Sequence, residues 1–144
     1  QVIFQENYSD YLQLHKKKNN FYSVGGMGHC SMIALGYSIY SKKNVLCLDG
    51  DGSMLMHFGN IFTISQNLKK NLKYILLNNN SHESVGGQAT NLDDINLRKI
   101  TQGLHFKRYL SINNRTNFKL KLKSFLGEKS SSFLEVKISK FVCL

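Results

Sequence analysis

Short apolar runs alternate along this sequence with longer segments whose apolar residues recur at helical spacing, and this alternation limits the fold more than any other feature. Brief apolar runs bounded by charged residues or glycine are typical of buried strands, whereas apolar stripes with a period near 3.6 residues indicate helices. We predict strands over residues 21–24, 44–48, 73–77 and 133–138, and helices over residues 29–40, 55–68, 93–104 and 118–126. Strands separated by helices imply an α/β fold, a doubly wound parallel sheet with helices on both faces. The 144 residues are expected to form one such domain, with its core at about 20–140.

Three loops that follow predicted strands have compositions unlike those of ordinary connectors. They are residues 25–28 (GGMG), residues 50–53 (GDGS) and residues 78–88 (NNNSHESVGGQ). Ligands of doubly wound sheets bind beyond the carboxyl ends of the strands. Glycine at a strand-to-helix turn lets the backbone approach a phosphate, and the start of the following helix offers free N–H groups. The three loops together therefore predict a diphosphate site.

Hard oxygen ligands accompany the glycines. A lone Gly-Asp-Gly is most often a plain turn, since both residue types favour turns. Here, however, Asn78 and Asn79 follow Gly52 after 25 intervening residues, at the end of the next predicted strand. An aspartate and an asparagine at neighbouring strand ends suit Mg²⁺ that is held partly by the phosphates of a ligand. The combination favours a metal-diphosphate site over a turn.

This spacing resembles the cofactor motif of thiamine-diphosphate enzymes, in which GDG is followed some two dozen residues later by NN. The resemblance implies that Mg²⁺ takes a carboxylate oxygen of Asp51, the side-chain oxygen of Asn79 and the backbone carbonyl of Ser81. Two diphosphate oxygens and a water would complete an octahedron. The cofactor-binding residues implied in this way are Gly25, Gly26, Met27, Gly28, Gly50, Asp51, Gly52, Ser53, Asn79 and Ser81.

The first loop matches a G-x-bulky-G turn found in the decarboxylases of this family. In those enzymes the bulky apolar side chain packs beneath the cofactor, so Met27 is the expected support. The alternative that Met27 simply fills the core stays open. The resemblance also implies that the carbonyl of Gly25 accepts a hydrogen bond from the 4′-amino group of the pyrimidine.

Within the family the sequence most resembles the phosphonopyruvate decarboxylases. Residues 24–30 (VGGMGHC), 48–60 (LDGDGSMLMHFGN) and 82–90 (HESVGGQAT) carry the resemblance, and HESVGGQ is its most specific part. The sequence departs from the pattern at Cys30, at Ala89 and after Lys140. The loop after the metal ligands faces the reacting end of the cofactor in related enzymes, which makes His82 and Glu83 the expected catalytic residues.

The resemblance implies decarboxylation of 3-phosphonopyruvate to phosphonoacetaldehyde and carbon dioxide, with thiamine diphosphate and Mg²⁺ as cofactors. In this family the glutamate that contacts the pyrimidine lies on a separate pyrimidine-binding domain, and we expect no such domain within these 144 residues. A partner domain or subunit would then complete the site for its 2-oxo acid in a dimer or larger assembly. Two alternatives stay open: a sulfopyruvate or other 2-oxo-acid decarboxylase subunit, and an inactive cofactor-binding fragment.

The composition argues against other classes of protein. The net charge is +10, but only three of the 19 basic residues are arginines able to make bidentate phosphate contacts, so we expect no nucleic-acid partner. No apolar run approaches the roughly 20 residues of a membrane span, and no signal-peptide stretch is visible, so we expect a cytoplasmic protein without a membrane partner. The three cysteines lack metal-site spacing and are expected to be reduced core thiols.

Overall fold

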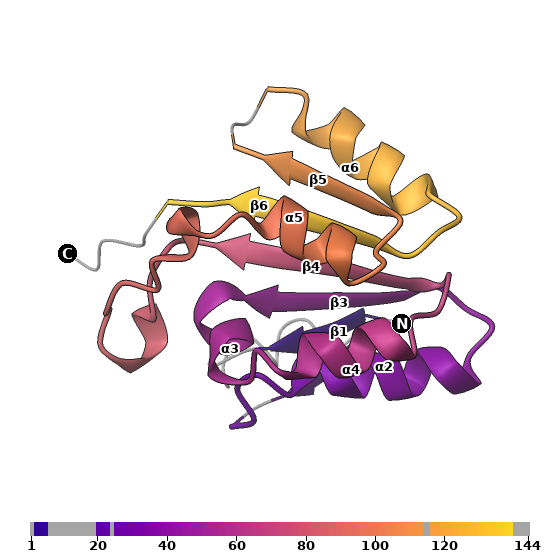
Figure 1. Ribbon diagram of the computed structural model, residues 1–144, viewed down its shortest axis with the longest axis horizontal. Coiled ribbons are helices and arrows are strands. Elements are labelled where there is room, and N and C mark those ends of the chain that lie inside the picture. The colour runs from indigo at the N-terminus through magenta and orange to yellow at the C-terminus, as the bar shows by residue number, and fades with distance from the viewer. Residues whose placement is uncertain (1, 6–19, 24, 114–115, 140–144) are drawn as a thin grey trace.

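The computed structural model describes residues 2–5, 20–23, 25–113 and 116–139. Six strands form one sheet in the order β2-β1-β3-β4-β6-β5, and every pairing between them is parallel (Figure 1). The strands are β1 (Val2–Gln5), β2 (Asn20–Ser23), β3 (Val45–Gly50), β4 (Leu72–Asn78), β5 (Arg108–Ile112) and β6 (Ser132–Lys137). Although β6 comes last in the sequence, it lies between β4 and β5.

Helices follow the strands, as the hydrophobic spacing predicts. They are α2 (Cys30–Tyr40), α3 (Asp51–Met56), α4 (Asn60–Gln66), α5 (Leu97–Gly103) and α6 (Phe118–Gly127), together with the short 3-10 turns η1 (Glu83–Val85) and η2 (Leu92–Asp94). The first residue of α3 directly follows the last residue of β3, so the Gly-Asp-Gly segment is itself the strand-to-helix turn.

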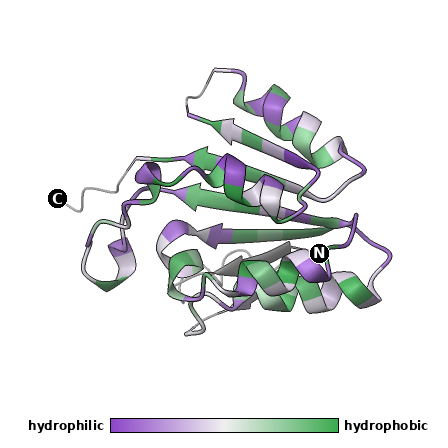
Figure 2. Cartoon of the chain, viewed as in Figure 1, coloured by the Kyte–Doolittle hydropathy of each residue, from purple (hydrophilic) through white to green (hydrophobic). Residues whose placement is uncertain are grey.

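The core occupies both faces of the sheet because neighbouring residues of β4 point to opposite sides. Tyr74 and Leu76 are buried in a cluster with residues of α2, α4 and α5, while Ile75 is buried in a second cluster that includes Phe125 of α6. Figure 2 shows the central strands largely in the hydrophobic colour. The predicted α/β class, a parallel sheet with helices on both faces, is confirmed.

Two of the predicted helices have different bounds in the structure. Residues 55–68 do not form one helix, because the chain leaves helical geometry at His57 and α4 begins only at Asn60. The Asn60 side chain donates to the carbonyl of Gly28 at 2.9 Å, a tertiary contact that the break permits. The helix expected from residue 93 begins at Leu97, because the Asn96 side chain caps it by accepting the Lys99 N–H at 3.0 Å. Strands β1 and β5 were not predicted.

The expectation for the cysteines is met where the structure describes them. Cys30 and Cys47 are buried thiols whose sulfur atoms lie 3.6 Å apart, well beyond the length of a disulfide bond, whereas Cys143 lies outside the described residues. Within the described ranges, none of the helices is both long and apolar enough to cross a membrane.

Candidate functional site

The carboxyl ends of β3 and β4 lie side by side, with Gly50 in register with Leu77. The loops that follow them enclose a cavity of about 180 Å³. Its walls combine residues from the first loop, the turn into α3 and the loop after β4: Met27, Gly50, Asp51, Gly52, Ser53, Leu77, Asn79, Ser81, His82, Glu83, Ser84 and Ile138. The structure therefore brings together most of the residues predicted from the sequence. Gly25, Gly26 and Gly28 do not line this cavity, although Met27 between them does.

Asp51 lies at the first position of α3 and is only 2% exposed. One of its carboxylate oxygens accepts hydrogen bonds from the Thr90 hydroxyl at 2.6 Å and from the Ser81 N–H at 3.2 Å. Both donors are neutral, and neither ion pair found among the described residues involves Asp51. A cation would stabilise the negative charge of this buried carboxylate further, and a carboxylate oxygen is a preferred ligand of Mg²⁺.

Asn79 presents a second oxygen to the same place. Its side-chain amide nitrogen donates to the Glu83 carboxylate at 2.6 Å, so the amide oxygen must point the other way. That oxygen accepts the Ser81 N–H at 3.1 Å, and the same N–H also donates to Asp51. Two of the three predicted metal ligands thus share one backbone donor, and Glu83, which we predicted to be catalytic, holds one of these two in orientation.

The first loop is fastened to the second by close backbone approach. The N–H of Gly28 donates to the Ser53 hydroxyl at 2.8 Å. A Cβ added at Gly28 would lie 2.8 Å from the Ser53 carbonyl and 2.6 Å from Nδ1 of His57. Gly28 also has a φ of +82°, in the region that favours glycine. The glycine that we predicted for cofactor binding therefore joins two of the loops.

The loop over residues 82–90 folds back on itself. Gly86 and Gly87 both have positive φ, and Ser81 pairs with Ala89 in an antiparallel bridge. The Gly87 N–H donates to the carbonyl of His82 at 3.0 Å, so this donor is already used within the loop. The reversal returns Thr90 to Asp51, a contact that no motif predicted. The paired glycines in the sequence were the signal that such a return was possible.

His82 packs directly against the Gly-Asp-Gly turn. A Cβ at Gly52 would lie 2.6 Å from its Nδ1, so only glycine leaves room for the imidazole. That Nδ1 atom is buried and has no hydrogen-bond partner among the described residues. The imidazole therefore turns Nδ1 toward the backbone at Gly52, while His82 itself lines the cavity.

Asp49 is a buried acid that the sequence did not single out. It is 2% exposed and accepts hydrogen bonds from the Tyr74 hydroxyl at 2.7 Å and from the Gly50 N–H at 3.0 Å. Burial raises the pKa of Asp49, against the opposing effect of hydrogen bonds from Ser53, Tyr74 and Gly50. Burial, and after it the negative charge of Asp49, raises the pKa of Tyr74. These contacts hold the end of β3 against β4.

A larger hollow of about 730 Å³ lies between the start of α6 and the end of β6. Its walls are mainly apolar and include Phe118, Leu120 and Val136. Of the residues that line the smaller cavity it shares only Ile138. We therefore assign the candidate site to the smaller cavity, where the polar groups converge.

The chain is similar to several known proteins. The family model described as "Thiamine pyrophosphate enzyme, C-terminal TPP binding domain" matches residues 5–136. A phosphonopyruvate decarboxylase of Streptomyces viridochromogenes is 38% identical over 77 residues, which are 54% of this chain and 19% of that protein. The sulfopyruvate decarboxylase subunit beta of Methanothermobacter thermautotrophicus is 37% identical over 87 residues, 60% of this chain and 47% of that protein. The chain thus spans less than half the length of these two relatives.

A solved structure shares the fold. It is the X-ray structure of a protein from Mycobacterium smegmatis whose description places it among thiamin diphosphate-dependent enzymes. The TM-score is 0.67 at 20% sequence identity, and the match covers 97% of this chain and 29% of that chain.

Proposed function

The chain belongs to the C-terminal TPP-binding domains of thiamine pyrophosphate enzymes, and on that premise we propose that it holds the diphosphate end of thiamine diphosphate, through Mg²⁺, for a 2-oxo-acid decarboxylase. The observation that carries the proposal is the convergence of Asp51 and Asn79 on the single N–H of Ser81. This places a buried carboxylate oxygen and an oriented amide oxygen together, which is the donor chemistry that Mg²⁺ prefers.

We assign each residue a role that its contacts support. Asp51 and Asn79 would bind Mg²⁺ through their side chains and Ser81 through its backbone carbonyl. Gly50, Gly52 and Ser53 would lie against the diphosphate, because the first N–H groups of a helix have no acceptor within it. Those contacts would be completed on the other side by residues 25–28, with Met27 beneath the cofactor. When bound, thiamine diphosphate would supply the electron sink for loss of carbon dioxide.

His82 and Glu83 have distinct surroundings, and we propose distinct tasks for them. His82 lines the cavity, and its imidazole is suited to exchange a hydrogen bond or a proton with a ligand there, while its Nδ1 packs against Gly52. Glu83 lines the same cavity while holding the Asn79 amide, so its carboxylate would both orient that metal ligand and stand near the substrate. Both residues are our candidates for catalytic groups.

The proposed substrate is 3-phosphonopyruvate, which would give phosphonoacetaldehyde and carbon dioxide. The support is the HESVGGQ segment over residues 82–88, together with relatives named phosphonopyruvate decarboxylase. Sulfopyruvate is the second candidate, because other relatives of similar identity are named as subunits or forms of sulfopyruvate decarboxylase. Rates measured with both substrates on the assembled enzyme would separate the two.

The proposed partner is a pyrimidine-binding domain or subunit that supplies the glutamate for the pyrimidine ring. Two observations support this. The cavity of about 180 Å³ is smaller than the roughly 300–1,000 Å³ usual for small-molecule sites, so these residues enclose only part of the cofactor. Several relatives are also named as the beta subunit of a sulfopyruvate decarboxylase, which implies a second subunit in those enzymes. We propose a dimer or larger assembly with the site at the contact.

Calorimetric titration of thiamine diphosphate tests the cofactor site. Binding by the chain together with its pyrimidine-binding partner should require Mg²⁺ and should disappear in Asp51→Ala. Asp94→Ala is the matched control, because it removes an exposed aspartate outside the cavity and should leave binding unchanged. Equal binding by Asp51→Ala, or binding that ignores Mg²⁺, would refute the proposal.

A further inference from the structure

A buried acid on β6 lies at one end of a hydrogen-bond network that leads to the cavity. Glu135 is 5% exposed and lies opposite Leu76 of β4 on one side and Ser111 of β5 on the other. One carboxylate oxygen accepts from the Asn78 amide at 2.8 Å, and the other accepts from the Tyr109 hydroxyl at 2.5 Å. The Ser111 hydroxyl lies 3.3 Å from this second oxygen but donates its one proton to Asn113 at 2.8 Å. Both donors are neutral, so the carboxylate is solvated by the protein's own dipoles.

Asn78 relays this arrangement to the loop after β4. Because its amide nitrogen faces Glu135, its amide oxygen faces the other way and accepts the N–H of Asn80 at 2.9 Å. Asn80 has a positive φ of 56°, an unusual conformation for a residue with a side chain, and this hydrogen bond helps to hold it. The turn made in this way orients the next residue, Ser81, whose N–H donates to the two proposed side-chain ligands of the metal, Asp51 and Asn79.

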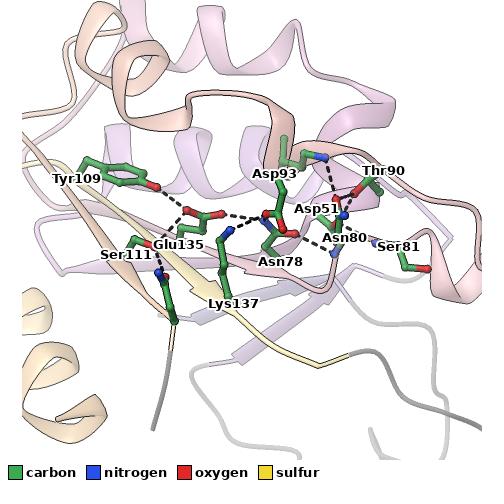
Figure 3. Close-up of polar contacts among 12 residues, drawn as sticks. Asp51, Asn78, Asn80, Ser81, Thr90, Asp93, Tyr109, Ser111, Glu135 and Lys137 are labelled. Carbon is green, nitrogen blue, oxygen red and sulfur yellow. Dashed lines mark hydrogen bonds and ion pairs between the residues drawn. The ribbon is translucent and has the colours of Figure 1, made fainter. Parts of the chain in front are cut away.

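A second branch of the network reaches Asp51 through Thr90, whose N–H donates to the carbonyl of Asn80 at 3.3 Å. The Asn80 side-chain oxygen accepts the Leu92 N–H at 2.9 Å and lies 3.2 Å from the Thr90 hydroxyl. Thr90 donates its one proton to Asp51 over the shorter distance of 2.6 Å. Figure 3 shows these side chains in a continuous row from Tyr109 to Thr90 and Asp51.

We propose that Glu135 is a positioning residue for the oxygen cluster of Asp51 and Asn79, and that it acts through the orientation of Asn78. The proposal rests on the function proposed above only in that these oxygens hold the metal ion. Only one orientation of the Asn78 amide suits both neighbours. An amide turned the other way would set its oxygen against the Glu135 carboxylate and its NH₂ group against the Asn80 N–H.

Exchanging donor and acceptor across the Asn78–Glu135 contact tests this inference. Asn78→Asp sets one carboxylate against another and should disturb the turn. Glu135→Gln still offers an acceptor to Asn78, because the Tyr109 and Ser111 hydroxyls can rotate to accept from its amide. The double variant restores a donor-acceptor pair with the direction reversed. The double variant does not restore the weaker 3.3 Å contact of the Asn78 amide with Asp93. The geometry of the turn should therefore recover largely but not completely.

Two readouts separate this inference from the proposed function. The first needs no ligand: hydrogen exchange at the Asn80 and Ser81 amides should quicken in Asn78→Asp and slow again in the double variant. The second is binding of Mn²⁺, used in place of Mg²⁺, measured by the paramagnetic signal of the free ion with thiamine diphosphate and the pyrimidine-binding partner present. Affinity should fall about 10-fold or more in Asn78→Asp and return to within about threefold in the double variant, as for outer contacts of metal ligands. Glu128→Gln, which removes a carboxylate bound to Arg108 instead, is the control for charge and should change neither readout.

The outcomes lead to separate conclusions. Failure of Glu135→Gln to restore slow exchange in Asn78→Asp would overturn the positioning role, whatever happens to Mn²⁺. If exchange is restored but the unsubstituted chain binds no Mn²⁺, the positioning role stands and the metal site is wrong. If Asn78→Asp alone does not fold, a folded double variant supports the contact, and an unfolded one overturns it.

Discussion

Gly28→Ala should destabilise the chain by forcing apart the first two loops of the site. The φ of +82° at this position costs a residue with a Cβ about 1–2 kcal/mol. The new methyl group would also lie 2.8 Å from the Ser53 carbonyl, which is backbone at α3 and cannot rotate away. Overpacking of this kind costs about 1–3 kcal/mol, so we expect the free energy of unfolding to fall by about 2–5 kcal/mol in total.

Urea denaturation of three glycine variants separates the two contributions. Gly25→Ala has a φ of +73° but no atom within 4 Å of the added Cβ, so it reports the backbone cost alone. Gly36→Ala lies inside α2 with open space around it and should stabilise the chain by about 0.5–1 kcal/mol. If Gly28→Ala lowers the free energy of unfolding no more than Gly25→Ala does, the inferred close approach between the first two loops is refuted.

Two further predictions concern buried polar groups at the site. Thr90→Val removes the hydroxyl that donates to Asp51 with little change of shape, so the affinity for Mn²⁺ with thiamine diphosphate should fall about 10-fold. An unchanged titration would show that Thr90 does not support the metal site. Asp49→Asn tests how stability depends on pH. Because burial raises the pKa of Asp49 in the folded state, the contribution of this carboxyl group to stability is fully present below its unfolded pKa and is lost as pH rises through its folded pKa. As pH rises from 4 to 7, the urea midpoint of the unsubstituted chain should therefore fall relative to that of Asp49→Asn. A constant difference between the two midpoints would contradict the burial argument.

The sequence predicts elements well where periodicity and burial agree. Helix α2 and strand β4 lie within a residue of their predicted bounds because their apolar patterns match their packing. The break at His57 was missed because apolar residues continue at helical spacing through it, while the Asn60 contact with Gly28 is tertiary. Strand β5 was missed because its first four residues are all partly exposed at the sheet edge, which leaves no alternation of buried and exposed positions.

The site divides in the same way. Asp51, Asn79 and His82 could be predicted because they stand in loops with distinctive composition, and the structure gathers them around one cavity. Thr90 and Glu135 could not, because their places depend on a loop reversal and on the register of β6 with β4. A threonine in a loop and a glutamate in a strand do not by themselves indicate a functional site. Only the three-dimensional neighbours reveal what these two side chains do.

The place of β6 in the sheet has a consequence for synthesis of the chain. As the polypeptide leaves the ribosome, β4 and β5 are complete before the strand that separates them exists. Until residues 132–137 emerge, β4 presents one open edge of unpaired backbone groups beside buried apolar side chains, a surface that invites pairing with other chains. Chains that stall or are cut before Ser132 should therefore aggregate or be degraded rather than persist as smaller cofactor-binding proteins.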